Sequence, residues 1–152
     1  MKKHLLLFAF SALALTSCED DDVQGYEMDM LKGEWKTVKE ERISGADNST
    51  ALSTDIPTGC STKSITEFRT DFYTSYTNYS GVDTACTSTK TEGTYTYATE
   101  SKELVIKYDN DLDRKYKVVI LSSSELRIMQ MFDNIDINGD GKIDINYITF
   151  KR

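Results

Sequence analysis

The sequence predicts an all-β protein of one domain: an eight-stranded up-and-down antiparallel barrel, with a β-sandwich of the same strands as the alternative. The 152 residues include 18 threonines, nine tyrosines and one proline, and threonine and tyrosine suit pleated, half-buried strands. Short stretches of alternating apolar and polar residues recur along the chain, with turn residues between them. A meander of short strands leaves two open edges, and closing the sheet into a barrel removes both.

Eight strands are expected in chain order. Alternation is clearest where Leu104, Ile106 and Tyr108 place apolar side chains on one face of a strand. The expected strands are residues 35–43, 64–68, 72–79, 91–97, 104–108, 115–121, 125–132 and 143–151. Residues 44–63, which hold the proline, are expected to form one long loop, and residues 80–88 a second loop. No long helix is expected.

The chain opens with a segment typical of an export signal. Lys2 and Lys3 precede an apolar run over residues 5–15, which is shorter than the about 20 residues that a membrane-spanning helix needs. Residues 15–18, Leu-Thr-Ser-Cys, resemble a bacterial lipobox. The resemblance implies that residues 1–17 are a signal peptide and that lipid chains on Cys18 attach the protein to a membrane. An ordinary secretory signal with a chance cysteine is the alternative.

An acidic segment follows this cysteine. Residues 19–22 read Glu-Asp-Asp-Asp, and because like charges extend a solvated linker, residues 18–30 are interpreted as an acidic tether. The run also resembles the export signal of surface lipoproteins in one group of Gram-negative bacteria. That resemblance implies an outer-membrane protein facing outward, with retention at the inner membrane as the alternative. The formal net charge of −7 lies largely in this tether, and without a basic stripe nucleic acid is not an expected partner.

The remaining cysteines and the single histidine limit the chemistry. The histidine is His4, inside the expected leader, so zinc hydrolysis and Ser-His-Asp or Cys-His catalysis lack their usual residues. Cys60 and Cys86 are expected to form a disulfide, because an exported protein meets an oxidising compartment. A reactive redox pair is disfavoured, since the two cysteines do not form a Cys-x-x-Cys pattern. The protein is not expected to be an enzyme.

One motif carries a family resemblance. Residues 31–35, Leu-Lys-Gly-Glu-Trp, look like the Leu-x-Gly-x-Trp opening of lipocalin-like proteins. Over residues 28–152 the chain resembles the small bacterial lipocalin-like domain lipoproteins, which share the lipobox, the tether and the two-cysteine pattern. The resemblance implies a barrel over residues 31–152. Its floor would be closed by Trp35, following Gly33, with Arg152 as the cation–π partner of the tryptophan ring.

The loop before the last strand is acidic and resembles the first nine positions of an EF-hand-like calcium loop. The candidate ligands are Asp136, Asn138 and Asp140, the backbone carbonyl of Lys142, and Asp144. Calcium takes six to eight oxygen ligands, and Gly141 permits the sharp turn that directs them inward. Position 12 is Tyr147 in place of the usual glutamate, so a site here would bind calcium weakly, with a dissociation constant on the order of 10⁻⁴ M. A plain hairpin turn is the alternative.

Two functions remain open. The resemblance implies an exported, lipid-anchored protein whose barrel is open at one mouth and binds a small apolar or amphipathic ligand. The alternative is a cell-surface interaction or accessory module with a calcium-stabilised hairpin, whose barrel is filled by its own side chains and whose loops contact a protein or glycan. Eight strands allow either interior.

Overall fold

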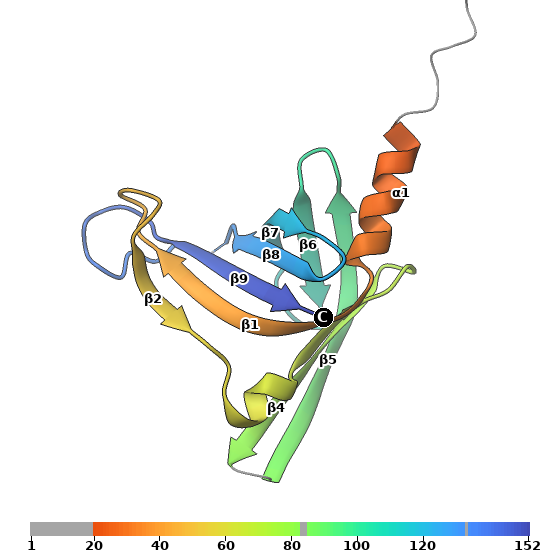
Figure 1. The fold of residues 1–152 in the computed structure, drawn as a ribbon, viewed down its shortest axis with the longest axis horizontal. Helices are drawn as coiled ribbons and strands as arrows, with labels where there is room; N and C mark the ends of the chain where they lie inside the picture. Colours follow the sequence, from red (N-terminus) through yellow and green to blue (C-terminus); the bar gives the residue numbers. More distant parts are fainter. Residues whose placement is uncertain (1–19, 83–84, 133) are drawn as a thin grey trace, which may run out of the picture.

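A closed eight-stranded barrel forms the body of the computed structural model, which describes residues 20–82, 85–132 and 134–152. The barrel strands are β1 (Gly33–Ile43), β3 (Ile65–Phe68), β4 (Tyr73–Val82), β5 (Ala85–Ala98), β6 (Glu103–Tyr108), β7 (Arg114–Leu121), β8 (Glu125–Gln130) and β9 (Ile145–Lys151). Each pairs antiparallel with the next, and β1 pairs with both β3 and β9 (Figure 1). This closure confirms the predicted barrel over the sandwich.

Two stretches expected to be loops contain paired backbone. Residues 44–63 hold the short strand β2 (Ala51–Asp55) and a 3-10 turn, η1 (Gly59–Lys63). β2 pairs with residues 40–43 of β1, on the edge that β3 leaves unpaired after Trp35. The expected loop at residues 80–88 is also largely strand, because β4 and β5 continue as a two-stranded ribbon as far as Val82 and Ala85. Both predictions were wrong because unpaired backbone groups beside a strand favour further pairing.

A helix, α1 (Asp20–Leu31), precedes the barrel, although no long helix was expected. Its last turn is part of the core: Leu31 is fully buried and Met28 packs against the buried cluster. The helix is therefore stabilised by tertiary packing, which local sequence does not reveal. Among the described residues, no helix is long and apolar enough to cross a membrane.

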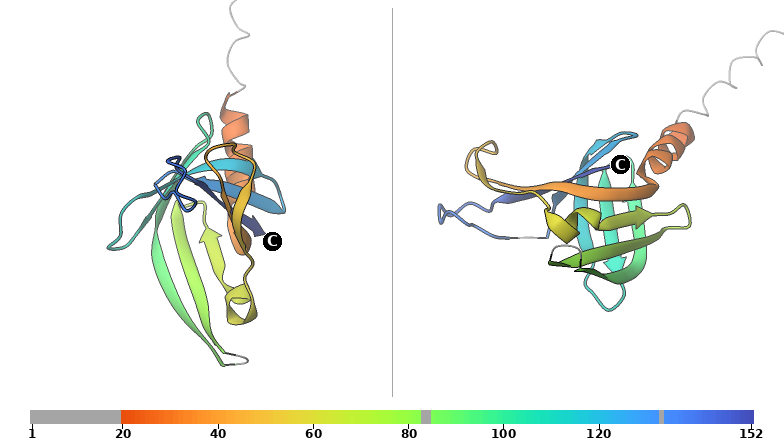
Figure 2. Two further views of the ribbon diagram at one scale, coloured as in Figure 1. Left: turned by 90° about the vertical axis from the view of Figure 1, so that its left-hand side faces the viewer. Right: turned by 60° about the horizontal axis from the view of Figure 1, so that its bottom comes forward.

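The barrel has two distinct ends. α1 and the β3–β4 turn lie at one end, and the loops that follow β1 and β8 project from the other (Figure 2). We call these the closed end and the mouth. The core extends from the closed end as far as Tyr108 and Tyr116 near the mouth and consists mainly of aromatic and branched aliphatic side chains; it comprises Leu31, Trp35, Phe68, Tyr95, Tyr97, Leu104, Ile106, Tyr108, Tyr116, Val118, Leu126, Ile128 and Phe150.

Candidate functional site: the barrel interior and its mouth

The closed end is sealed around Trp35, which is fully buried. Its indole Nε1–H donates a hydrogen bond to the carbonyl oxygen of Leu31 at 2.8 Å. The Arg152 guanidinium lies 4.1 Å from the centroid of the tryptophan ring and donates hydrogen bonds to the carbonyl oxygens of Met30 at 2.9 Å and Lys32 at 2.5 Å. One arginine therefore joins the end of α1, the tryptophan and the last strand.

Position 33 favours glycine over a residue with a side chain for two steric reasons. Its φ is +116°, a conformation that glycine adopts without penalty. A Cβ here would also lie 2.9 Å from Nη1 of Arg152. A side chain at this position would push the guanidinium away from Trp35.

The side chains that face the barrel interior change from apolar to polar toward the mouth. Strand alternation and register place Glu40 opposite Ile148, which packs on the core, and Arg42 opposite Asn146. The inward positions near the mouth, which we call the polar mouth layer, are Glu40, Arg42, Tyr76, Tyr108, Arg114, Tyr116, Gln130 and Asn146. The interior thus has an apolar closed end below a ring of hydrogen-bonding groups.

Side chains of the polar mouth layer contact one another across strands. The Asn146 side-chain amide donates to Oε1 of Gln130 at 2.6 Å. The Arg114 guanidinium lies 5.5 Å from the centroid of the Tyr108 ring, and Tyr116 meets Phe132 edge to face with ring centroids 5.3 Å apart. These contacts link β6, β7, β8 and β9 at the mouth.

Burial sets the protonation of this layer. Burial raises the pKa of both Tyr108 and Tyr116. The neighbouring Tyr116 hydroxyl raises the pKa of Tyr108 further. Burial also raises the pKa of Glu40, with a further rise from Asp55 and a partial offset from Arg42. At neutral pH the tyrosines therefore present neutral hydroxyl groups in a partly desolvated setting, where hydrogen bonds are stronger than in water. Such an arrangement suits recognition of a polar group.

The acidic loop between β8 and β9 is organised by its own backbone. The Asp136 carboxylate accepts hydrogen bonds from the amides of Gly139 and Gly141, both at 2.8 Å. The Asn138 side-chain amide donates to the Asp140 carboxylate at 2.9 Å. Three predicted calcium ligands therefore lie in one loop, held by Asx-type bonds that a hairpin turn also uses.

Asp144, the ninth loop position, has a structural role. It is 2% exposed, and its carboxylate accepts hydrogen bonds from the amides of Ile137 at 2.7 Å and Gly45 at 3.2 Å. It thereby ties the β8–β9 loop to the loop after β1. Lys142 is exposed and donates its amide to Asp140. Among the described residues, no group of three His, Cys, Asp or Glu side chains is placed to hold a metal ion, so the calcium site stays a prediction.

The family follows from a sequence comparison. Residues 31–128 match the model of the lipocalin-like domain. The chain belongs to the lipocalin-like family. The match begins at the Leu-x-Gly-x-Trp opening and covers most of the barrel, and lipocalin-like proteins are in general ligand-binding carriers and not enzymes.

The chain is also similar to several solved lipocalin structures at low sequence identity. A bovine lipocalin allergen, Bos d 2, is 13% identical, with a TM-score of 0.43 over 82% of this chain and 74% of that one. A deswapped triple mutant of bovine odorant-binding protein is 15% identical, with a TM-score of 0.40 over 81% and 74%. A dog lipocalin allergen is 12% identical, with a TM-score of 0.41 over 80% and 73%. No curated protein matches the sequence of this lipocalin-like chain.

The cysteines of this lipocalin-like protein fall in different places. Cys60 and Cys86 form a disulfide with their Cα atoms 5.5 Å apart, joining η1 to the β4–β5 ribbon. Cys18, the predicted lipidation site, lies outside the described residues.

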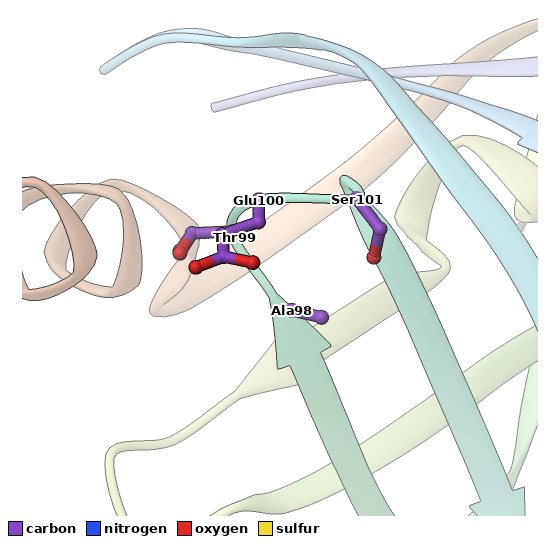
Figure 3. Close-up of a pocket in the computed structure, with 4 residues that line it drawn as sticks. All are labelled: Ala98, Thr99, Glu100 and Ser101. Carbon is purple, nitrogen blue, oxygen red and sulfur yellow. The ribbon is translucent and has the colours of Figure 1, made fainter. Parts of the chain in front are cut away.

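The closed end also has a shallow pocket in the β5–β6 turn, lined by Ala98, Thr99, Glu100 and Ser101 (Figure 3). These turn residues are largely exposed and include no group from the polar mouth layer.

Proposed function

We propose that this lipocalin-like protein binds a small amphipathic ligand inside its barrel, with the polar group of the ligand at the polar mouth layer and its apolar part directed toward the closed end. The observation that carries the proposal is the change in the inward-facing side chains, from apolar groups around Trp35 to partly desolvated hydrogen-bonding groups around Tyr116. A purely apolar ligand would displace solvent from these polar side chains without replacing its hydrogen bonds, which is costly. An amphipathic ligand matches both zones.

The location proposed for this binding is the outer membrane of a Gram-negative bacterium. Support comes from the sequence: the apolar leader over residues 5–15, the lipobox ending in Cys18 and the acidic run that follows. Lipid chains on Cys18 would hold the barrel at the membrane surface.

The test is native mass spectrometry of the domain purified from its own host, followed by titration of the stripped protein with the mass that co-purifies. We expect a bound small molecule, and we expect Tyr116→Phe to weaken its affinity about fivefold, since one hydrogen bond contributes about 1 kcal/mol. Tyr147→Phe is the matched control, because Tyr147 lies on the outer face, where the Arg127 guanidinium is 4.5 Å from its ring centroid. Equal affinities in the two variants would overturn the assigned site.

A second candidate function, an interaction module with a filled barrel, has its own supporting observation. Large aliphatic side chains on the mouth loops are exposed, and clusters of exposed apolar residues often mark binding surfaces. They are Leu112 in the β6–β7 turn and Ile135, Ile137 and Ile143 in the β8–β9 loop. A bare or calcium-only mass in the same experiment would favour this function over ligand transport.

Calcium addition to chelator-treated protein gives a separate prediction. We expect heat of binding with a dissociation constant on the order of 10⁻⁴ M, as in extracellular modules, and loss of that heat in Asp140→Ala. Asp47→Ala is the control, because the Asp47 carboxylate caps the amides of Ser49 and Thr50 in the neighbouring loop. Calorimetry without heat in the unmodified protein would show that the loop is a hairpin turn alone.

A further inference from the structure

We propose that the closed end of the barrel rests on the lipid bilayer and that the mouth faces away from it, so that ligand or partner enters from the aqueous side. This orientation rests on the lipid anchor proposed above. It goes further, because an anchor on a flexible tether would leave the barrel free to turn.

The first argument is that the segment next to the anchor is docked on the barrel. The Glu27 carboxylate accepts a hydrogen bond from the hydroxyl of Tyr97 at 2.7 Å and pairs with the Lys102 ammonium at 2.5 Å. Burial raises the pKa of Glu27, but the hydrogen bonds from Lys102 and Tyr97 outweigh it and lower the pKa overall, so the carboxylate is charged at neutral pH. Leu31, fully buried, and Arg152 fasten the end of the same helix.

The second argument is the length and direction of the connection. α1 begins at Asp20, two residues after the proposed anchor at Cys18. The helix has 12 residues and is therefore about 18 Å long at 1.5 Å per residue. It lies at the closed end, opposite the projecting mouth loops (Figure 2). An anchor at its start would hold the closed end within about one helix length of the bilayer.

The third argument is the surface that this orientation presents to lipid. Tyr26 on α1 and Phe72 in the β3–β4 turn are exposed by 66% and 51%, and aromatic side chains favour the membrane–water interface. Phe72 has a positive φ of 61°, a conformation uncommon for a bulky residue. The exposed cations at this end, Lys32 and Arg69, are paired with Asp29 at 2.6 Å and Asp71 at 2.8 Å, so the contact with lipid depends on the two aromatic side chains.

The mouth loops offer a competing membrane surface, since Leu112, Ile137 and Ile143 are exposed there. The docked helix decides between the two ends. With α1 held by Glu27, the start of α1 and the mouth lie on opposite sides of the barrel, so a bilayer next to the start of α1 would not meet the mouth loops.

The experiment places a fluorophore at either end of the full lipidated protein. Ser101→Cys labels the β5–β6 turn at the closed end and Leu112→Cys labels the β6–β7 turn at the mouth; both positions are exposed. Each labelled protein is reconstituted in vesicles of phosphatidylethanolamine and phosphatidylglycerol that contain headgroup-quencher lipid. We expect at least threefold stronger quenching at position 101 than at position 112. Equal quenching, or stronger quenching at position 112, would overturn the orientation.

Two further variants test the lipid anchor and the docking of α1 separately. Cys18→Ala tests the anchor by flotation with vesicles: wild-type protein is expected to float and the variant is not. If the variant floats as well as wild type, or if wild type does not float, both the anchor and the orientation are overturned. Glu27→Lys places a cation opposite Lys102 and is expected to bring the quenching ratio between the two positions toward one. Asp29→Asn, on the exposed side of the same helix, is expected to retain the ratio. An unchanged ratio in Glu27→Lys would show that the docking of α1 does not orient the barrel.

Discussion

Replacing Trp35 with alanine is expected to lower the free energy of unfolding by about 3–5 kcal/mol, the usual cost of removing a large buried aromatic side chain. The side chain is fully buried, it donates a hydrogen bond to Leu31, and the Arg152 guanidinium lies against its ring. Alanine would leave a cavity at the closed end and release the arginine. Equilibrium unfolding in guanidinium chloride measures the loss.

Two comparisons make the Trp35 result specific. Tyr26→Ala removes an aromatic side chain that is 66% exposed, and it is expected to change stability by no more than about 0.5 kcal/mol. Arg152→Met removes the guanidinium and is expected to fall between the two. A loss below about 1 kcal/mol for Trp35→Ala would contradict the assignment of this residue as the closure of the barrel.

Removing the disulfide is expected to cost about 3.5 kcal/mol in the chain-entropy model of cross-links. Cys60 and Cys86 are separated by 26 residues in sequence. The bond closes this segment into a loop and so lowers the conformational entropy of the unfolded state. In the folded state it holds η1 against the β4–β5 ribbon, which extends beyond the pairing of β5 with β6. Thermal and denaturant unfolding of the double variant Cys60→Ala/Cys86→Ala measures the change.

Chemical reduction provides the matching experiment. Wild-type protein treated with a phosphine reductant is expected to lose about as much stability as the double variant, whereas the double variant is expected to be insensitive to the reductant. A reduced protein as stable as the oxidised one would mean that folding depends little on this loop closure.

Much of the barrel was predictable because its strands are regular. The alternation of Leu104, Ile106 and Tyr108 predicts a strand with one inward face, and the structure places β6 there with these three side chains buried. The closure of the sheet was also predictable, because eight short strands in sequence have two edges to protect. The additional strand β2 was not predictable, because residues 51–55 carry no apolar face and pair only where β3 leaves β1.

The polar mouth layer was not found from the sequence because a register shift decides which side chains of β1 point inward. Trp35 faces inward, so strict alternation would direct Glu41 inward as well. The pairing of β1 with β9 shifts between Thr37 and Lys39, and one extra residue reverses the alternation. Glu40 and Arg42 therefore face the interior, whereas strict alternation from Trp35 would place them on the outer face.

The sequence by itself determined the class of the protein, the number of barrel strands and the Trp35 opening, because these depend on local alternation and on one short motif. Only the tertiary structure decided that Asp20–Leu31 forms a docked helix, that Asp144 joins two loops, and that the inward face near the mouth is polar. Each of these depends on partners far apart in the chain: Glu27 on Tyr97 and Lys102, Asp144 on Gly45, and Glu40 on Ile148. Local residue patterns specify secondary structure, whereas packing and register, set by the closed sheet, specify which side chains meet.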